Sequence, residues 1–67
     1  METFGKQLRA LREEKEMSQS DLAAVLRTSK QNISRWEKGQ FEPSQEATLI
    51  LARFFGVSID YLFGIEK

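Results

Sequence analysis

The sequence predicts an all-α fold, in which five short helices pack into one domain over residues 1–67. Serines that favour helix N-caps precede four of the predicted helices, at Ser18, Ser29, Ser44 and Ser58. Apolar residues recur at helical spacing, and no stretch alternates apolar and polar residues as a half-buried strand does. A chain of this length has room for a single domain and contains no internal repeat.

The first predicted helix begins near Thr3, a candidate cap, and runs to about Lys15. Phe4, Leu8 and Leu11 fall at helical spacing and form one apolar stripe. This helix is therefore expected to pack one face on the core and to leave its charged residues in solvent.

Residues 18–39 are predicted to form two helices joined by a tight turn. Ser18 caps the first helix, and Asp21 completes a near capping box with an acid in place of the usual Glu. Ser29 caps the second helix, and Gly39 provides a left-handed stop. A helix, a short turn and a second helix form the arrangement that presents its second helix to DNA.

The second of these helices, predicted over about residues 29–38, has only two large apolar residues. Ile33 and Trp36 lie three positions apart, so Trp36 is predicted to be structural. The other side chains are polar donors and acceptors of the kind that match base edges in a major groove. A solvated helix without a partner is the alternative interpretation, but the capped helix just upstream favours DNA binding.

The segments SQSDLAAVL and SKQNISRWEKG resemble the Cro/repressor (Xre-type) helix-turn-helix family. The matching residues are Gln19, Leu22, Ala23, Ile33, Trp36, Glu37 and Gly39. The similarity extends from about Phe4 to Leu62 and implies a lambda-repressor-like domain, with the motif at about residues 18–37. The family usually has Gly where this chain has Arg27, so either Arg27 adopts a strained positive φ or the first motif helix ends differently.

The resemblance also implies which residues contact double-stranded DNA. They are Gln19, Ser29, Lys30, Gln31, Asn32, Ser34, Arg35, Lys38, Gly39 and Gln40. Lys30 and Arg35 can donate to guanine O6 and N7, and Gln31 can pair bidentately with adenine. Gln19 is expected to contact a phosphate near the N-terminus of the first motif helix. Lys38 and the backbone of the next two residues are expected to lie on the opposite flank.

The net charge of zero, from ten basic and ten acidic residues, argues mildly against nucleic-acid binding. The distribution is uneven, because residues 26–40 hold four basic residues and a single acid, Glu37. Positive charge therefore gathers on the predicted reading helix. For Glu37, the resemblance implies a structural ion pair with Arg12, and a solvent-exposed acid is the alternative.

Apolar residues in excess of a small core gather on the last two predicted helices, at about residues 45–55 and 59–63. Leu51, Ala52 and Phe55 already supply the core spacing of the fourth helix. The resemblance places a dimer surface in this region. The predicted interface residues are Ile50, Phe54, Ile59, Tyr61 and Phe63. A broad apolar face without a partner is the alternative interpretation.

These features favour a sequence-specific DNA-binding transcriptional regulator, most simply a repressor that binds a near-palindromic operator as a homodimer. A protein-interaction module of the same fold, such as an antitoxin or antirepressor, is the alternative. The neutral charge and the surplus apolar residues slightly favour that alternative. A binding screen on random-sequence DNA at low salt would separate the two, and selection of bound DNA from a randomised pool would be the most informative single experiment.

An enzyme is not expected, because the chain has no histidine, no cysteine and no glycine-rich phosphate loop. The same absences remove the commonest metal ligands, so no metal and no cofactor are expected. Nothing resembles a signal peptide, and the longest apolar run, Leu49 to Ala52, is too short to cross a bilayer. A cytoplasmic protein without membrane contact is therefore expected.

Overall fold

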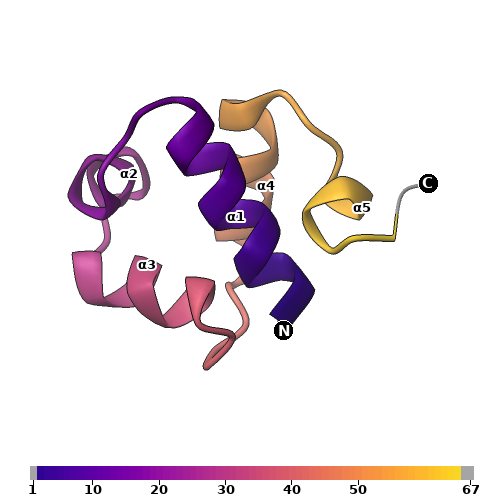
Figure 1. Cartoon of the computed structure of the whole chain (residues 1–67), viewed down its shortest axis with the longest axis horizontal. Helices are drawn as coiled ribbons and strands as arrows, with labels where there is room; N and C mark the ends of the chain where they lie inside the picture. The colour runs from indigo at the N-terminus through magenta and orange to yellow at the C-terminus, as the bar shows by residue number, and fades with distance from the viewer. Residues whose placement is uncertain (1, 66–67) are drawn as a thin grey trace.

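A computed structural model describes residues 2–65, which form five α-helices and no strand (Figure 1). The helices are α1 (Glu2–Glu14), α2 (Gln19–Leu26), α3 (Lys30–Glu37), α4 (Gln45–Phe55) and α5 (Ile59–Leu62). The predicted five-helix, all-α fold is confirmed. One boundary differs: α1 begins at Glu2, so Thr3 lies within its first turn rather than capping it. Within residues 2–65, no helix is long and apolar enough to cross a membrane.

Serine N-caps begin four of the helices, as the sequence predicts. The hydroxyl oxygens of Ser18, Ser29, Ser44 and Ser58 each accept a backbone N–H from three residues further on, at 2.9–3.2 Å. The backbone N–H of Ser18 also donates to Asp21 Oδ2 at 3.0 Å, which completes the predicted capping box. Each cap contributes about 1 kcal/mol and defines where its helix starts.

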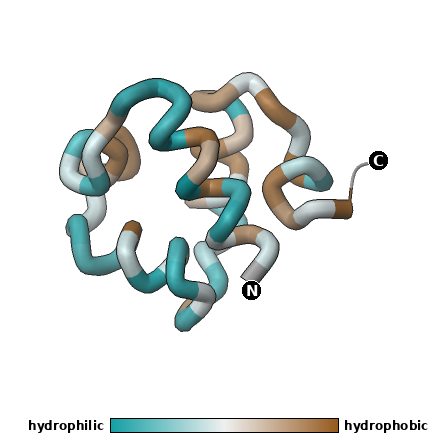
Figure 2. Tube along the Cα trace, in the orientation of Figure 1, coloured by the Kyte–Doolittle hydropathy of each residue, from teal (hydrophilic) through white to brown (hydrophobic). Residues whose placement is uncertain are grey.

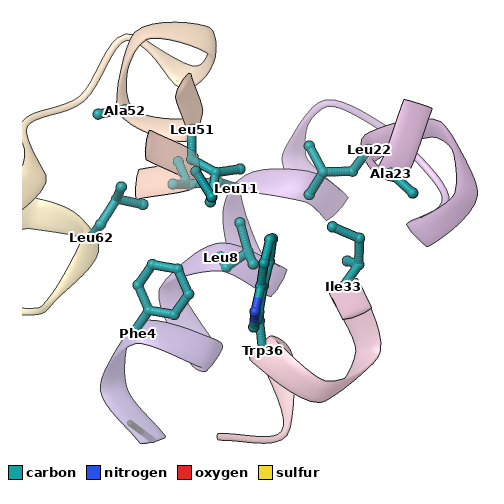
Figure 3. Close-up of a cluster of buried hydrophobic side chains, with 11 residues drawn as sticks. Phe4, Leu8, Leu11, Leu22, Ala23, Ile33, Trp36, Leu51, Ala52 and Leu62 are labelled. Atoms are coloured by element: carbon teal, nitrogen blue, oxygen red, sulfur yellow. The ribbon is translucent and has the colours of Figure 1, made fainter. Parts of the chain in front are cut away.

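The core is one cluster to which all five helices contribute (Figure 3). The buried apolar residues are Phe4, Leu8, Leu11, Leu22, Ala23, Ile33, Trp36, Ala47, Leu51, Ala52 and Leu62. Ala47 and its neighbour Thr48 were not predicted to be buried. The Thr48 hydroxyl donates to the Ser44 carbonyl oxygen at 2.9 Å, so this polar group is satisfied where it is buried.

Trp36 belongs to this core although it lies on α3. It is 7% exposed, and in Figure 3 its ring lies among the core side chains. Its predicted structural role is therefore confirmed. Gly5 permits the close approach of α1 to the end of α3, since a Cβ there would lie 2.7 Å from the Trp36 carbonyl oxygen and would also overlap the Glu37 carbonyl. A side chain at residue 5 would push the two helices apart.

The turn between α2 and α3 contains Arg27 in the left-handed conformation, with φ 55° and ψ 43°. The Thr28 N–H donates to the Ala23 carbonyl oxygen at 2.9 Å, and the Arg27 N–H donates to Ala24 at 3.3 Å. These bonds satisfy the last carbonyls of α2 in the manner of a glycine-terminated helix. Of the two alternatives left open by the sequence, the structure adopts the strained one, at a cost of about 1 kcal/mol.

Replacing Arg27 by glycine is expected to raise the free energy of unfolding by about 0.5–1 kcal/mol, because glycine adopts this conformation without steric cost. Urea unfolding followed by tryptophan fluorescence measures the change. Arg27→Ala is the matched control, since it removes the same side chain and keeps the strained backbone. An equal gain in Arg27→Ala would contradict the backbone explanation.

Candidate DNA-binding surface

Helix α3 lies along one edge of the molecule, below α1 in Figure 1, and most of its residues are hydrophilic in Figure 2. The side chains of Lys30, Gln31 and Arg35 are exposed, and those of Asn32 and Ser34 are half-buried. Ile33 and Trp36 point into the core and attach the helix to the rest of the domain. The polar face is therefore free to meet a partner without disturbing the core.

Two of the predicted contact residues also stabilise the start of α3. The Ser29 hydroxyl accepts the Asn32 N–H at 3.2 Å, and Asn32 Nδ2 donates to Thr28 Oγ1 at 2.9 Å. Their side chains are partly committed to this local structure. The side chains of Lys30, Gln31 and Arg35 take no part in these hydrogen bonds at the α3 N-cap, so they are better placed to contact a partner.

The connection after α3 folds back on the last turn of that helix. Gly39 has φ 76°, a conformation that favours glycine. The Lys38 N–H donates to the Ser34 carbonyl oxygen at 3.0 Å, and the Gln40 N–H donates to the Arg35 carbonyl oxygen at 2.9 Å. The predicted flanking residues, Lys38, Gly39 and Gln40, therefore lie beside the C-terminal end of α3.

A bidentate ion pair joins α1 to α3. Arg12 Nε donates to Glu37 Oε2 at 2.6 Å and Arg12 Nη2 donates to Glu37 Oε1 at 3.1 Å. The two side chains are 12% and 5% exposed, so Glu37 is not the solvated acid of the alternative interpretation. Arg12 Nη1 also donates to the Met17 carbonyl oxygen at 2.8 Å, which ties the α1–α2 connection to the same pair.

Gln19 extends this network to α2, because its Nε2 donates to Glu37 Oε1 at 3.1 Å. The sequence does not predict this bond, and the family resemblance implies only a phosphate contact for Gln19. A glutamine amide nitrogen has two N–H donors, so one remains for a phosphate oxygen. The arrangement orients the amide at the N-terminus of α2, where the helix amides also favour an anion.

The hydrogen bond with the Glu37 carboxylate raises the pKa of Arg12 above its already high ordinary value. Burial opposes this rise, and the negative charges of Glu37 and Glu13 add to it. Arg12 is therefore always cationic, and it neutralises the single acid in α3. The basic residues of α3, Lys30 and Arg35, are exposed and belong to a helix whose one acid is already paired.

The predicted dimer-interface residues fall into two groups. The large apolar residues of α4 and α5 that are exposed are Leu49, Ile50, Phe54 and Ile59, at 36–41%. Tyr61 and Phe63 are instead half-buried and pack against the core, where the Phe63 ring centroid lies 5.1 Å from that of Phe4. Fewer apolar residues are therefore exposed on α5 than the sequence predicts. On α4, Leu49 is exposed in addition to the two predicted residues.

The family model described as helix-turn-helix matches residues 8–62 of this chain. The chain therefore belongs to the Xre-type helix-turn-helix family, a family of DNA-binding transcription regulators rather than of enzymes. The predicted family is confirmed.

Several transcription regulators are similar in sequence. The HTH-type transcriptional activator BcrR of Enterococcus faecalis is 38% identical over 64 residues, which cover 96% of this chain and 31% of the activator. The HTH-type regulator ImmR of Bacillus subtilis is 31% identical over 65 residues, which cover 97% of this chain and 51% of that protein. The uncharacterized regulator MJ0272 of Methanocaldococcus jannaschii is 42% identical over 50 residues, covering 75% and 76% of the two chains. This chain thus spans about a third and a half of the first two proteins.

Among solved structures, the chain is similar to the P22 c2 repressor, which was crystallised in complex with the synthetic operator 9T in the presence of Tl⁺. The TM-score is 0.89 and the sequence identity is 30%, with 98% of this chain and 100% of that chain covered. The similarity therefore extends over the whole lambda-repressor-like fold.

Replacing Glu37 by glutamine is expected to lower the free energy of unfolding by about 3 kcal/mol, because Arg12 would keep its charge in a buried position without a counter-charge. Urea unfolding measures the loss. Glu13→Gln is the matched control, since Glu13 pairs with Arg9 at 3.2 Å on the surface, where the side chains are 55% and 65% exposed. That control should cost less than about 1 kcal/mol. Equal losses in the two variants would contradict a structural role for the buried pair.

Proposed function

We propose that this chain is a sequence-specific DNA-binding domain of a transcription regulator, with α3 as the recognition helix in the major groove. The observation that carries the proposal is the exposed polar face of α3, held in place by Ile33 and Trp36 in the core and by the buried Arg12–Glu37 pair. A rigidly held polar helix can present donors and acceptors to base edges with little loss of entropy on binding.

The exposed residues of α3 are proposed to contact bases, and the flanking residues are proposed to contact the DNA backbone. Arg35 and Lys30 would donate to guanine, and Gln31 would pair with adenine. Ser29, Asn32 and Ser34 would contribute at the edges of the reading face. Gln19 would contact a phosphate on one flank, and Lys38, Gly39 and Gln40 would contact the backbone on the other. Phosphate contacts fix the register, whereas base contacts supply the specificity.

Repression is the activity we favour, because the P22 c2 repressor bound to its operator has a similar fold over 98% of this chain. Activation is the alternative outcome, since the relative with 38% identity is named an activator.

The exposed apolar residues of α4 favour a second candidate function, a protein-interaction module. A selection that recovers no preferred sequence would support that candidate.

A homodimer on a near-palindromic site is part of the proposal. One recognition helix contacts only a few base pairs, which is too little for specificity in a genome. Two copies related by a two-fold axis would place their recognition helices about 34 Å apart, one helical turn of DNA. The exposed apolar residues Ile50, Phe54 and Ile59 supply a surface on which such copies could meet.

Arg35 and Gln31 are expected to carry specificity, whereas Gln19 carries affinity. Arg35→Ala should weaken binding to the selected site by about 1–3 kcal/mol and relax the preference at one base position. Gln19→Ala should weaken binding to all sequences about equally. Fluorescence anisotropy with the selected duplex and with random duplexes measures both effects. Equal losses on specific and random DNA for Arg35→Ala would refute its assignment as a base-reading residue.

Ile59→Glu is expected to leave the fold intact, to reduce dimer formation and to make operator binding less cooperative. A carboxylate in an apolar contact between copies would lose its hydration without a partner. Sedimentation velocity and binding isotherms report the two losses. Val25→Glu is the matched control for dimer formation, because Val25 is 38% exposed, close to the 40% of Ile59, and lies on α2 rather than on α4 or α5. Unfolding of Ile59→Glu would assign Ile59 to the core, and unchanged cooperativity would move the interface to Ile50 and Phe54.

A further inference from the structure

The connection after α3 carries an aromatic residue to which the proposed DNA contacts assign no role. Phe41 is 52% exposed and belongs neither to the buried core nor to the half-buried residues packed against it. Core packing therefore does not account for its ring. The ring instead contacts a residue of the recognition helix, since Cζ of the Arg35 guanidinium lies over the ring, 5.5 Å from its centroid.

The backbone after α3 produces this contact. The positive φ of Gly39 reverses the chain, and the Gln40 N–H then donates to the carbonyl oxygen of Arg35 itself. Phe41 follows directly, which brings its side chain back toward Arg35. The separation lies within the range of about 6 Å over which a cation and an aromatic face attract each other.

Within the described part of the chain, the contact leaves the side-chain N–H donors of Arg35 without a hydrogen-bond acceptor. Within residues 2–65, no carboxylate forms an ion pair with Arg35. An ion pair would occupy the in-plane N–H donors of the guanidinium, whereas an aromatic face supports the cation and leaves the edges of its plane free. The N–H groups on those edges are the donors that a bidentate contact with guanine O6 and N7 requires.

We propose that Phe41 is a positioning residue that holds the Arg35 guanidinium ready for a guanine contact and thereby sets base preference at that position. This role rests on the proposed function of α3. An unrestrained arginine loses rotamer freedom when it binds, and the ring removes part of that freedom beforehand. Loss of the ring should therefore weaken binding to the preferred site about three- to ten-fold, with much less effect on random DNA.

The DNA test uses the duplex that the wild-type chain selects from a randomised pool. Phe41→Leu keeps an apolar side chain and loses the aromatic face, so it should show the loss, whereas Phe41→Tyr should bind as the wild type does. In an Arg35→Ala background, Phe41→Leu should cause no further loss. Val25→Ala is the control for trimming an exposed apolar residue, since Val25 is 38% exposed on α2 and has no assigned role.

A second measurement needs no DNA. The aromatic ring current should shift the side-chain proton resonances of Arg35 upfield, and this shift should disappear in Phe41→Leu and persist in Phe41→Tyr. Unshifted resonances in the wild type would overturn the proposal. So would an equal effect of Phe41→Leu with and without Arg35, because the ring would then contact DNA or a second copy itself. A chain that selects no DNA would contradict the proposed function, while the resonances would still decide whether the ring holds Arg35.

Discussion

The buried ion pair between Arg12 and Glu37 is the interaction on which the presentation of α3 depends. Arg12 comes from α1, Glu37 from the last turn of α3, and Gln19 adds the start of α2 to the same carboxylate. Three helices are thus joined at one carboxylate, next to the point where Trp36 enters the core. Because hydrogen bonds between charged groups are strongly directional, the pair specifies the orientation of α3 as well as its attachment.

Close packing supports this polar junction from the inside. Trp36 lies one residue before Glu37 and fills the core, and Gly5 lets α1 approach the carbonyls of both residues. A helix with only two large apolar anchors is held firmly because its last turn is fixed on both sides, by the core and by the ion pair. The remainder of α3 can therefore be polar, which is what recognition of base edges requires.

The two ends of the proposed site are stabilised by different means. At the start of α3, Ser29 and Asn32 form a local cap, and the turn before them accepts strain at Arg27. At its end, Gly39 reverses the chain and brings Phe41 to Arg35. The strained residue adds a positive charge beside α3 where a glycine would add none, which suits the proposed partner with a negatively charged backbone.

The sequence by itself determined the five helices, the helix-turn-helix and the polar face of α3, because serine caps and apolar spacing act within a few residues of one another. The tertiary structure decided what depends on distant segments. It places Gln19 on the carboxylate of Glu37 and the Phe63 ring against that of Phe4, contacts that no local pattern encodes. It also decided the backbone of Arg27, because a steric cost of about 1 kcal/mol is accepted only when packing on both sides of the turn outweighs it.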